Sequence, residues 1–188
     1  MPSKNLIILF GGRSVEHEIS VRSATNVVKY IDPTHFNLSV IGISKGGNWF
    51  LLDHPEQGIE TGKEIFLFLS ATHPHFEIKA SGTSIAIQIV FPILHGTDGE
   101  DGSIQGLMQC LNVILIGSSV LGSAISMDKI VSKKLLEHAG VPVVPYMSFT
   151  KDEEISFEEV KNKLGLPFIV KAGNLGSSVG ISKVNTLE

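Results

Sequence analysis

Length, composition and charge exclude several classes of protein. The chain has 188 residues, 43% of them hydrophobic, which is enough for one sizeable core, or for one domain and part of a second. Its 15 basic and 19 acidic residues give a formal charge of -4, without the basic excess that contact with a phosphate backbone requires. Nucleic acid is therefore not an expected partner.

No targeting or membrane-spanning segment is expected. The first apolar run, residues 6–10, stops at Gly11 and is shorter than the apolar region of a secretion signal. No stretch approaches the ~18 uninterrupted apolar residues of a membrane span. The one cysteine, Cys110, lies among apolar neighbours and has no partner for a disulfide, which predicts a buried thiol in a reducing compartment. We therefore expect a cytoplasmic protein without membrane contact.

The first part of the chain predicts a strand, a helix and a second strand. Residues 6–10 form a continuous apolar run, as expected for a strand buried on both faces of a parallel sheet. Residues 14–31 carry apolar side chains at helical spacing, with Ser14 or Ser20 as the cap, and residues 37–44 return as a strand. This succession predicts an α/β fold, in which ligands bind beyond the carboxyl ends of the strands.

The rest of the chain predicts further elements of this sheet and then a second unit. Residues 46–84 are interrupted by glycines and prolines and predict small antiparallel strands, such as residues 65–69, that elaborate the first domain. Later elements are expected as a central strand at residues 85–91, a helix at 103–111, a strand at 113–116, helices at 127–138 and 157–164, and strands at 168–171 and 181–184.

The first cluster of candidate functional residues lies where the first strand meets the helix. Glycines there allow the backbone to turn and a ligand to approach, and Glu16 and Ser20 follow directly. An ordinary strand-to-helix turn explains the same residues, because an acidic side chain near a helix N-terminus is favourable in itself. A zinc site of the HExxH type is excluded, because Val21 stands where the second histidine is required.

Two further glycine-rich segments carry candidate residues. Residues 91–102 combine His95 with carboxylates, although a surface turn with a hydrogen-bonded histidine would explain them as well. In residues 171–180, backbone amides and hydroxyls can surround phosphate oxygens and Lys171 can offset their charge; a flexible hairpin tip is the alternative. Neither a Walker motif nor a dinucleotide motif occurs, so a nucleotide loop here would be of another type.

Four motifs occur in order along the chain. They are GG-x-S-x-E-x-E-x-S at 11–20, LHG-x-x-GEDG-x-IQG at 94–106, S-A-x-S-MDK at 123–129 and K-x-G-x-x-GSS-x-G at 171–180. Together they resemble the D-alanine:D-alanine ligase family of the ATP-grasp superfamily, and the resemblance spans the chain except residues 46–84. It implies an N-terminal doubly wound (pre-ATP-grasp) parallel-sheet domain over residues 1–124, on the substrate side. The beginning of an ATP-grasp central domain, on the nucleotide side, would follow over residues 125–188.

The resemblance implies a ligase that joins two D-alanines for peptidoglycan precursor synthesis. ATP would phosphorylate the first carboxylate, and the amine of the second D-alanine would attack the acyl phosphate. Magnesium, or manganese in its place, would accompany ATP, with its ligands expected beyond residue 188. A homodimer is the family expectation.

The resemblance also assigns roles to residues by matched position. Glu16 would hold the ammonium of the first D-alanine, and Ser177 would lie in a hydrogen-bonded relay to it, so that both act as catalytic residues. The remaining assignments are His95, near the carboxylate of the first D-alanine, and Ser20 for substrate binding, and Lys129, Lys171 and Ser178 for the ATP phosphates.

Several alternatives stay open at the level of sequence. Relatives continue past the match to residue 188 with further catalytic parts, so we expect the isolated chain to be inactive. The second substrate could also be D-lactate or D-serine, because the segment that selects it in the family has no counterpart here. Outside the enzyme class, the alternatives are a non-catalytic binding module and a generic α/β domain with fortuitous motifs.

Overall fold

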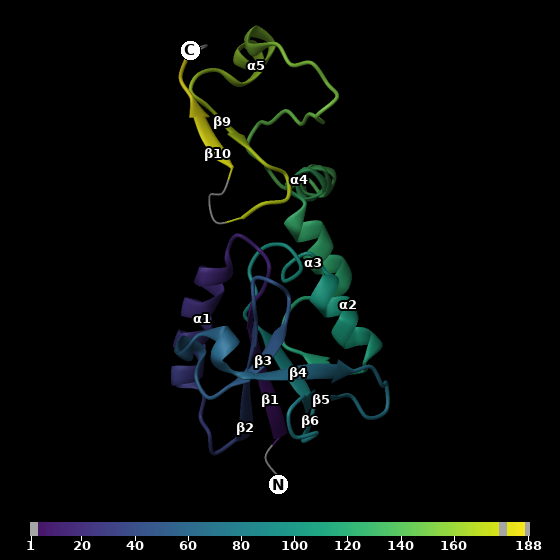
Figure 1. Cartoon of the computed structure of the whole chain (residues 1–188). Helices are drawn as coiled ribbons and strands as arrows, with labels where there is room; N and C mark the ends of the chain where they lie inside the picture. Colours follow the sequence, from purple (N-terminus) through teal and green to yellow (C-terminus); the bar gives the residue numbers. More distant parts are fainter. Residues whose placement is uncertain (1–3, 177–179, 187–188) are drawn as a thin grey trace. The chain divides into compact units, whose positions relative to one another are not determined.

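The computed structural model describes residues 4–176 and 180–186, which fall into two compact units. The first unit is Met1–Ala124 and the second is Ile125–Glu188, coloured purple to teal and green to yellow in Figure 1. Each unit has its own sheet, and each is described by itself. No helix among the described residues is long and apolar enough to cross a membrane.

The first unit is built on a mixed sheet whose parallel strands lie together. β1 (Lys4–Gly11) pairs in parallel with β2 (Phe36–Ile43) on one side and with β7 (Ile89–Pro92) on the other, and β7 pairs in parallel with β8 (Ile114–Leu115). Beyond β2, the antiparallel strands β3 (Trp49–Leu52), β4 (Lys63–Phe68), β5 (His75–Ile78) and β6 (Ser84–Ala86) follow in that order. The 3₁₀ turns η1 (Pro55–Gln57) and η2 (Ile59–Thr61) lie between β3 and β4.

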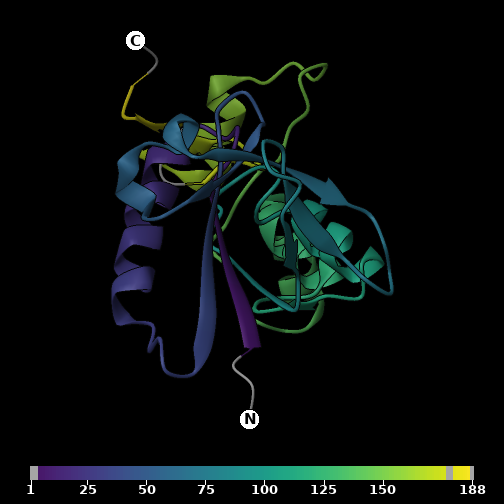
Figure 2. The ribbon, with the colours of Figure 1, turned by 60° about the horizontal axis from the view of Figure 1, so that its bottom comes forward.

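Helices cover both faces of the parallel strands, which confirms the predicted α/β fold class. Figure 2 shows α1 (His17–Tyr30) on one side of β1 and β2 and teal helices, among them α2 (Ser103–Cys110), on the other. Alternate side chains of β1 point to opposite faces, because successive residues of a strand do so. Leu6, Ile8, Phe10, Val40 and Ala24 form the core under α1, and Ile7, Leu9, Ile41, Ile104 and Met108 form the core under α2.

The chain winds in two directions away from the middle of this sheet. From β1 it crosses through α1 to β2 on one side, whereas from β7 it crosses through α2 to β8 on the other. A crevice opens at the carboxyl ends of two parallel strands where the winding reverses, and such crevices bind ligands. The two segments that the sequence predicts to be functional, one after β1 and one after β7, therefore begin at the same edge of the sheet.

Two predictions about the first unit require correction. Residues 85–91 were expected to form one central strand, but the chain turns at Ile87, so that β6 lies at the antiparallel edge of the sheet and β7 beside β1. Ile87 is buried at this corner and its N–H donates to the carbonyl of Pro74 at 3.0 Å. Cys110 is exposed rather than buried, because α2 turns Ile104 and Met108, and not Cys110, toward the sheet. The small antiparallel strands expected within residues 46–84 are present as β3 to β5.

The helix expected at residues 127–138 is interrupted. α3 (Val120–Met127), which the sequence did not predict, ends one residue before α4 (Lys129–His138) begins. The extended residue between them, Asp128, accepts hydrogen bonds through Oδ1 from the N–H groups of Ile130 at 2.9 Å and Val131 at 3.0 Å. Asp128 thus caps α4 and separates it from the preceding helix.

The second unit also contains the helix and the two strands that the sequence predicts at its end. α5 (Phe157–Leu164) is followed by β9 (Phe168–Lys171), which pairs antiparallel with β10 (Ile181–Val184). The chain between β9 and β10 includes the glycine-rich segment, of which residues 172–176 and 180 are described. The nucleotide-loop candidate therefore connects two paired strands.

Candidate active site

Ser20 links the ends of the two central strands. Its side chain is fully buried within α1, where Oγ accepts a hydrogen bond from the N–H of Gly11 at 2.7 Å and donates to the carbonyl of Ile93 at 2.5 Å. Gly11 has a φ of +86°, and a Cβ at this position would collide with the carbonyl of Ile43. Ser20 is thus a bridge between β1 and the segment after β7. The prediction that Ser14 or Ser20 caps the helix is wrong, because no described side chain makes a capping hydrogen bond at the start of α1.

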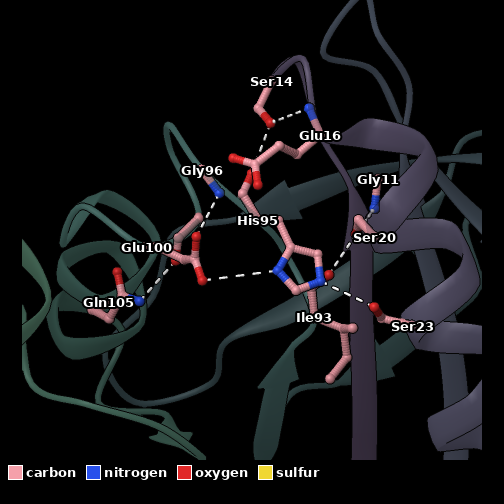
Figure 3. Close-up of polar contacts among 11 residues, drawn as sticks. Gly11, Ser14, Glu16, Ser20, Ser23, Ile93, His95, Gly96, Glu100 and Gln105 are labelled. Carbon is pink, nitrogen blue, oxygen red and sulfur yellow. Dashed lines mark hydrogen bonds and ion pairs between the residues drawn. The ribbon is translucent and has the colours of Figure 1, made fainter. Parts of the chain in front are cut away.

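Glu16 is buried where α1 begins. It is 4% exposed, and its N–H donates to Ser14 Oγ at 2.9 Å, whose hydroxyl donates in turn to the carbonyl of His95 at 2.7 Å. The carboxylate lies against Gly96, because a Cβ on this glycine would collide with Glu16 Oε2. Figure 3 shows Ser14 and Glu16 facing His95 and Gly96, so two segments about 80 residues apart in sequence meet here.

The ring of His95 lies between two polar side chains. Nε2 is 3.1 Å from Ser23 Oγ of α1, and Nδ1 is 3.8 Å from Glu100 Oε1 (Figure 3). The other carboxylate oxygen of Glu100 accepts a hydrogen bond from the N–H of Gly96 at 2.7 Å. A buried carboxylate can hold an ammonium group, and an imidazole next to a carboxylate can donate to an anionic oxygen.

Ser23 and Glu100 are the site residues that the sequence reading did not single out. Ser23 lies three residues after Ser20, which places both hydroxyls on neighbouring positions of one helix face. The three-residue spacing between Ser20 and Ser23 could therefore have identified Ser23 from the sequence. Glu100 was one of several acidic residues after β7, and nothing in the sequence distinguished it from Asp98 or Asp101.

A cleft of about 410 Å³ opens at the carboxyl ends of β1 and β2 and beside the segment after β7. Gly12, Trp49, Leu94 and His95 line it, whereas Glu16 is not among its lining residues. At its rim, Arg13 Nη2 lies 2.8 Å from Asp98 Oδ2, in an ion pair between two largely exposed side chains. His95 is therefore the predicted substrate residue that faces the open space.

Asp101 fixes the turn that follows His95. Its Oδ2 accepts from the N–H of Asp98 at 2.9 Å and its Oδ1 from the N–H of Ser103 at 3.0 Å. Burial acts to raise the pKa of Asp101, but these hydrogen bonds outweigh it and hold the pKa below its ordinary value. The carboxylate is thus ionised at neutral pH and joins the turn to the start of α2.

In the second unit, Lys129 holds the glycine-rich segment by its backbone. Nζ donates to the carbonyl of Leu175 at 2.6 Å and to that of Gly173 at 3.3 Å, and the N–H of Lys129 donates to Gly173 at 3.1 Å. Lys171 is exposed at the end of β9. Ser177 and Ser178 lie outside the described residues, so the roles expected for them stay predictions.

A metal centre has no ligand set in the described part of the chain. Within residues 4–176 and 180–186, no three or more His, Cys, Asp and Glu side chains are grouped so that they could hold a metal ion. The three carboxylates after His95 do not form such a group, because Asp98 pairs with Arg13 and Asp101 binds backbone N–H groups. None of these residues is assigned to a metal.

The fold and the site together define a class of protein. They define a two-unit α/β protein, in which a sheet with a polar crevice at its parallel strands is followed by a smaller unit where a lysine holds a glycine-rich segment after a strand. A family model described as D-ala D-ala ligase N-terminus matches residues 5–118, and one described as D-ala D-ala ligase C-terminus matches residues 135–188. The chain belongs to the D-Ala-D-Ala ligase family.

Individual relatives agree with this assignment. The chain is 40% identical to D-alanine-D-alanine ligase A of Escherichia coli over 205 residues, which cover 96% of the chain and 54% of that protein. The solved D-alanine-D-alanine ligase of Coxiella burnetii superposes with a TM-score of 0.87 at 33% identity, covering 98% of the chain and 57% of the other. The Bacillus anthracis enzyme complexed with ATP has a TM-score of 0.66 at 27% identity, with 99% and 50% covered. The chain thus spans about half the length of these relatives.

Proposed function

We propose that this chain contributes the first-substrate site and part of the nucleotide site of an ATP-dependent ligase. The enzyme joins two D-alanines into D-alanyl-D-alanine for peptidoglycan precursor synthesis. One observation carries the proposal: in a chain of this family, the buried carboxylate of Glu16 lies against Gly96, next to His95, where the segments after β1 and β7 meet. Family membership supports ATP as the second ligand of the enzyme.

In the first unit, binding follows from charge and burial. The Glu16 carboxylate holds the ammonium of the first D-alanine, and His95 donates to its carboxylate, which orients the oxygen that receives the phosphoryl group. Ser20 contributes by holding the carbonyl of Ile93 and the N–H of Gly11, so that both substrate-binding segments keep their position. The amine of the second D-alanine then attacks the carbonyl carbon of the acyl phosphate, which forms the peptide bond and releases inorganic phosphate and the amine proton.

In the second unit, positive charge serves the nucleotide. Lys129 and Lys171 neutralise charge on the ATP phosphates, and Ser177 and Ser178 belong to the same proposed loop over them. Magnesium, with manganese as the alternative ion, accompanies ATP and supplies further charge neutralisation. Its ligands are proposed to lie beyond residue 188.

The wider setting is proposed on the same basis. The enzyme acts in the cytoplasm as a homodimer, and the 188 residues by themselves do not catalyse ligation. D-lactate and D-serine remain the alternative second substrates. A comparison of the 188-residue chain with protein expressed from the complete coding sequence tests the expected inactivity, since turnover by the shorter chain would contradict it.

A coupled assay of ADP release tests the proposed reaction. Protein from the complete coding sequence, given ATP and magnesium, should release ADP only when D-alanine is present, and D-lactate or D-serine added with D-alanine identifies the second substrate. Glu16→Gln should lower kcat/KM for D-alanine by about 100-fold or more, because it removes the charge that holds the ammonium. Glu18→Gln is the matched control, since Glu18 is exposed and pairs with Lys45. Equal activity of wild type and Glu16→Gln would refute the proposal.

A further inference from the structure

Gln105 makes one polar contact from inside the core of the first unit. It lies in the first half of α2 and is 8% exposed. Its Nε2 donates a hydrogen bond to the carbonyl of Gly99 at 2.9 Å, whereas its Oε1 has no hydrogen-bond partner in the described part of the chain. Figure 3 shows the side chain on the far side of the Glu100 turn from α1. The amide is thus used only as a donor.

The acceptor of this bond belongs to the turn that carries Glu100. The N–H groups of Gly99 and Glu100 both donate to the carbonyl of Gly96, at 3.2 Å and 2.9 Å. Glu100 then returns across the turn, with one oxygen on the N–H of Gly96 and the other 3.8 Å from the Nδ1 of His95. A shift of Gly99 therefore moves the carboxylate that faces the imidazole.

A glutamine is an unfavourable choice for packing at this position. Its neighbours Ile104 and Met108 are apolar and buried, and a buried acceptor without a partner destabilises the folded state. A methionine would fill a similar volume without that penalty. A buried polar side chain with an unpaired acceptor is expected at a functional site rather than in a purely structural core.

We propose that Gln105 is a positioning residue for the first D-alanine. By holding Gly99, it keeps Glu100 against His95 and so fixes the imidazole in the orientation that receives the substrate carboxylate. This inference rests on the proposed function for the identity of the substrate, but not for the hydrogen bond between Gln105 and the turn.

Two substitutions distinguish the effect of the hydrogen-bond donor of Gln105 from the effect of its side-chain volume. Gln105→Met keeps the packing and removes the donor, and Gln105→Glu keeps the shape but places a carboxylate against the carbonyl of Gly99. Gln109→Met is the matched control, because Gln109 lies one turn further along α2 and is exposed. All three are made in protein from the complete coding sequence, and hydrogen exchange is measured on the same samples.

The expected result is selective. Gln105→Met and Gln105→Glu should each raise KM for the first D-alanine by about tenfold and leave KM for ATP within about twofold. Exchange of the Gly96 and Glu100 amide protons should rise by about tenfold in Gln105→Met, while its melting temperature stays within a few degrees of wild type. Gln109→Met should match wild type in every measurement.

Three results would overturn the inference. They are an unchanged KM for D-alanine in Gln105→Met, equal increases of KM for D-alanine and ATP together with a large loss of thermal stability, and wild-type behaviour of Gln105→Glu. The exchange measurement keeps this inference separate from the proposed function. If wild type fails to ligate D-alanine but Gln105→Met still frees the Gly96 and Glu100 amides, the function is refuted and the positioning of the turn stands.

Discussion

The two units of the chain differ in how much of their apolar surface they bury. In the first unit β1 is covered on both faces, and Phe10, Ile7 and Ile8 have no exposed surface. In the second unit Val160 is the one hydrophobic side chain among the described residues that is buried, whereas Ile169 and Val170 of β9 are 54% and 52% exposed. The first unit therefore has a core of its own, and the second has little to hold it together.

This difference in burial indicates that the two proposed ligand sites differ in rigidity. Glu16 and His95 lie on segments fixed by the buried hydroxyl of Ser20 and by the turn around Asp101, so the proposed D-alanine site is formed before any ligand binds. The glycine-rich segment is held mainly through Lys129, a residue that is itself proposed to contact phosphate. Regions with few buried contacts open at low free energy, and elements that move on ligand binding belong to them. We expect the nucleotide side to be the more adaptable one.

The largest expected effect comes from the core of the first unit. Phe10→Ala should lower the free energy of unfolding of that unit by about 4 kcal/mol, because it empties a fully buried site. Ile169→Ala in β9 should change stability by less than about 1 kcal/mol, since more than half of this side chain is already exposed. Urea unfolding is followed by the fluorescence of Trp49, the one tryptophan of the chain, for the first unit, and by far-UV circular dichroism for both units. Equal effects of the two substitutions would contradict the comparison.

A smaller effect is expected from the bridge between β1 and the segment after β7. Ser20→Ala leaves the N–H of Gly11 and the carbonyl of Ile93 without their buried partner, which should destabilise the first unit by about 2 kcal/mol. The same urea experiment measures it, with the half-buried Ser23→Ala as a comparison that breaks one contact to His95 instead of two backbone contacts. A Ser20→Ala protein as stable as wild type would show that the bridge is not needed.

The second unit offers a matched pair of helix caps. Asp128→Ala removes two hydrogen bonds from the start of α4 and should destabilise this unit by about 1 kcal/mol. Ser156→Ala at the start of α5 should have almost no effect, because the Ser156 side chain makes no capping hydrogen bond. Hydrogen exchange of the α4 and α5 amides distinguishes the two. The expectation would be contradicted if Ser156→Ala increased exchange in α5 more, relative to wild type, than Asp128→Ala increased exchange in α4.

The smallest expected effect is a pH dependence of the turn after His95. The pKa of Asp101 is lower in the folded state than its ordinary value of 3.8, so its contribution is present at neutral pH and is lost as the pH falls through the folded pKa. Between about pH 5 and pH 3, wild type should therefore lose about 0.5 kcal/mol more stability than Asp101→Asn, because this partly exposed group is screened by solvent. Identical slopes for wild type and Asp101→Asn would contradict the assignment.

The sequence predicted the elements whose pattern is local, and it failed where distant contacts decide. The run at residues 6–10 identified a strand buried on both faces, and the glycine-rich segments after β1 and β7 identified the crevice. The corner at Ile87 was missed because an apolar run looks the same whether it forms one strand or two. The position of Cys110 was missed because apolar sequence neighbours do not reveal which way a helix faces. Glu100 became distinguishable from Asp98 and Asp101 only through its distance to His95.

The most direct test of the account is hydrogen exchange of the chain with D-alanine alone and with ATP and magnesium alone. D-alanine is expected to slow exchange in residues 11–20 and 93–102 of the first unit, and L-alanine is expected to leave it unchanged. ATP is expected to slow exchange in residues 129–131 and 171–176 of the second unit and to leave the first unit unchanged. Protection by D-alanine in the second unit, or by ATP around Glu16 and His95, would contradict the assignment of the two substrates to the two units.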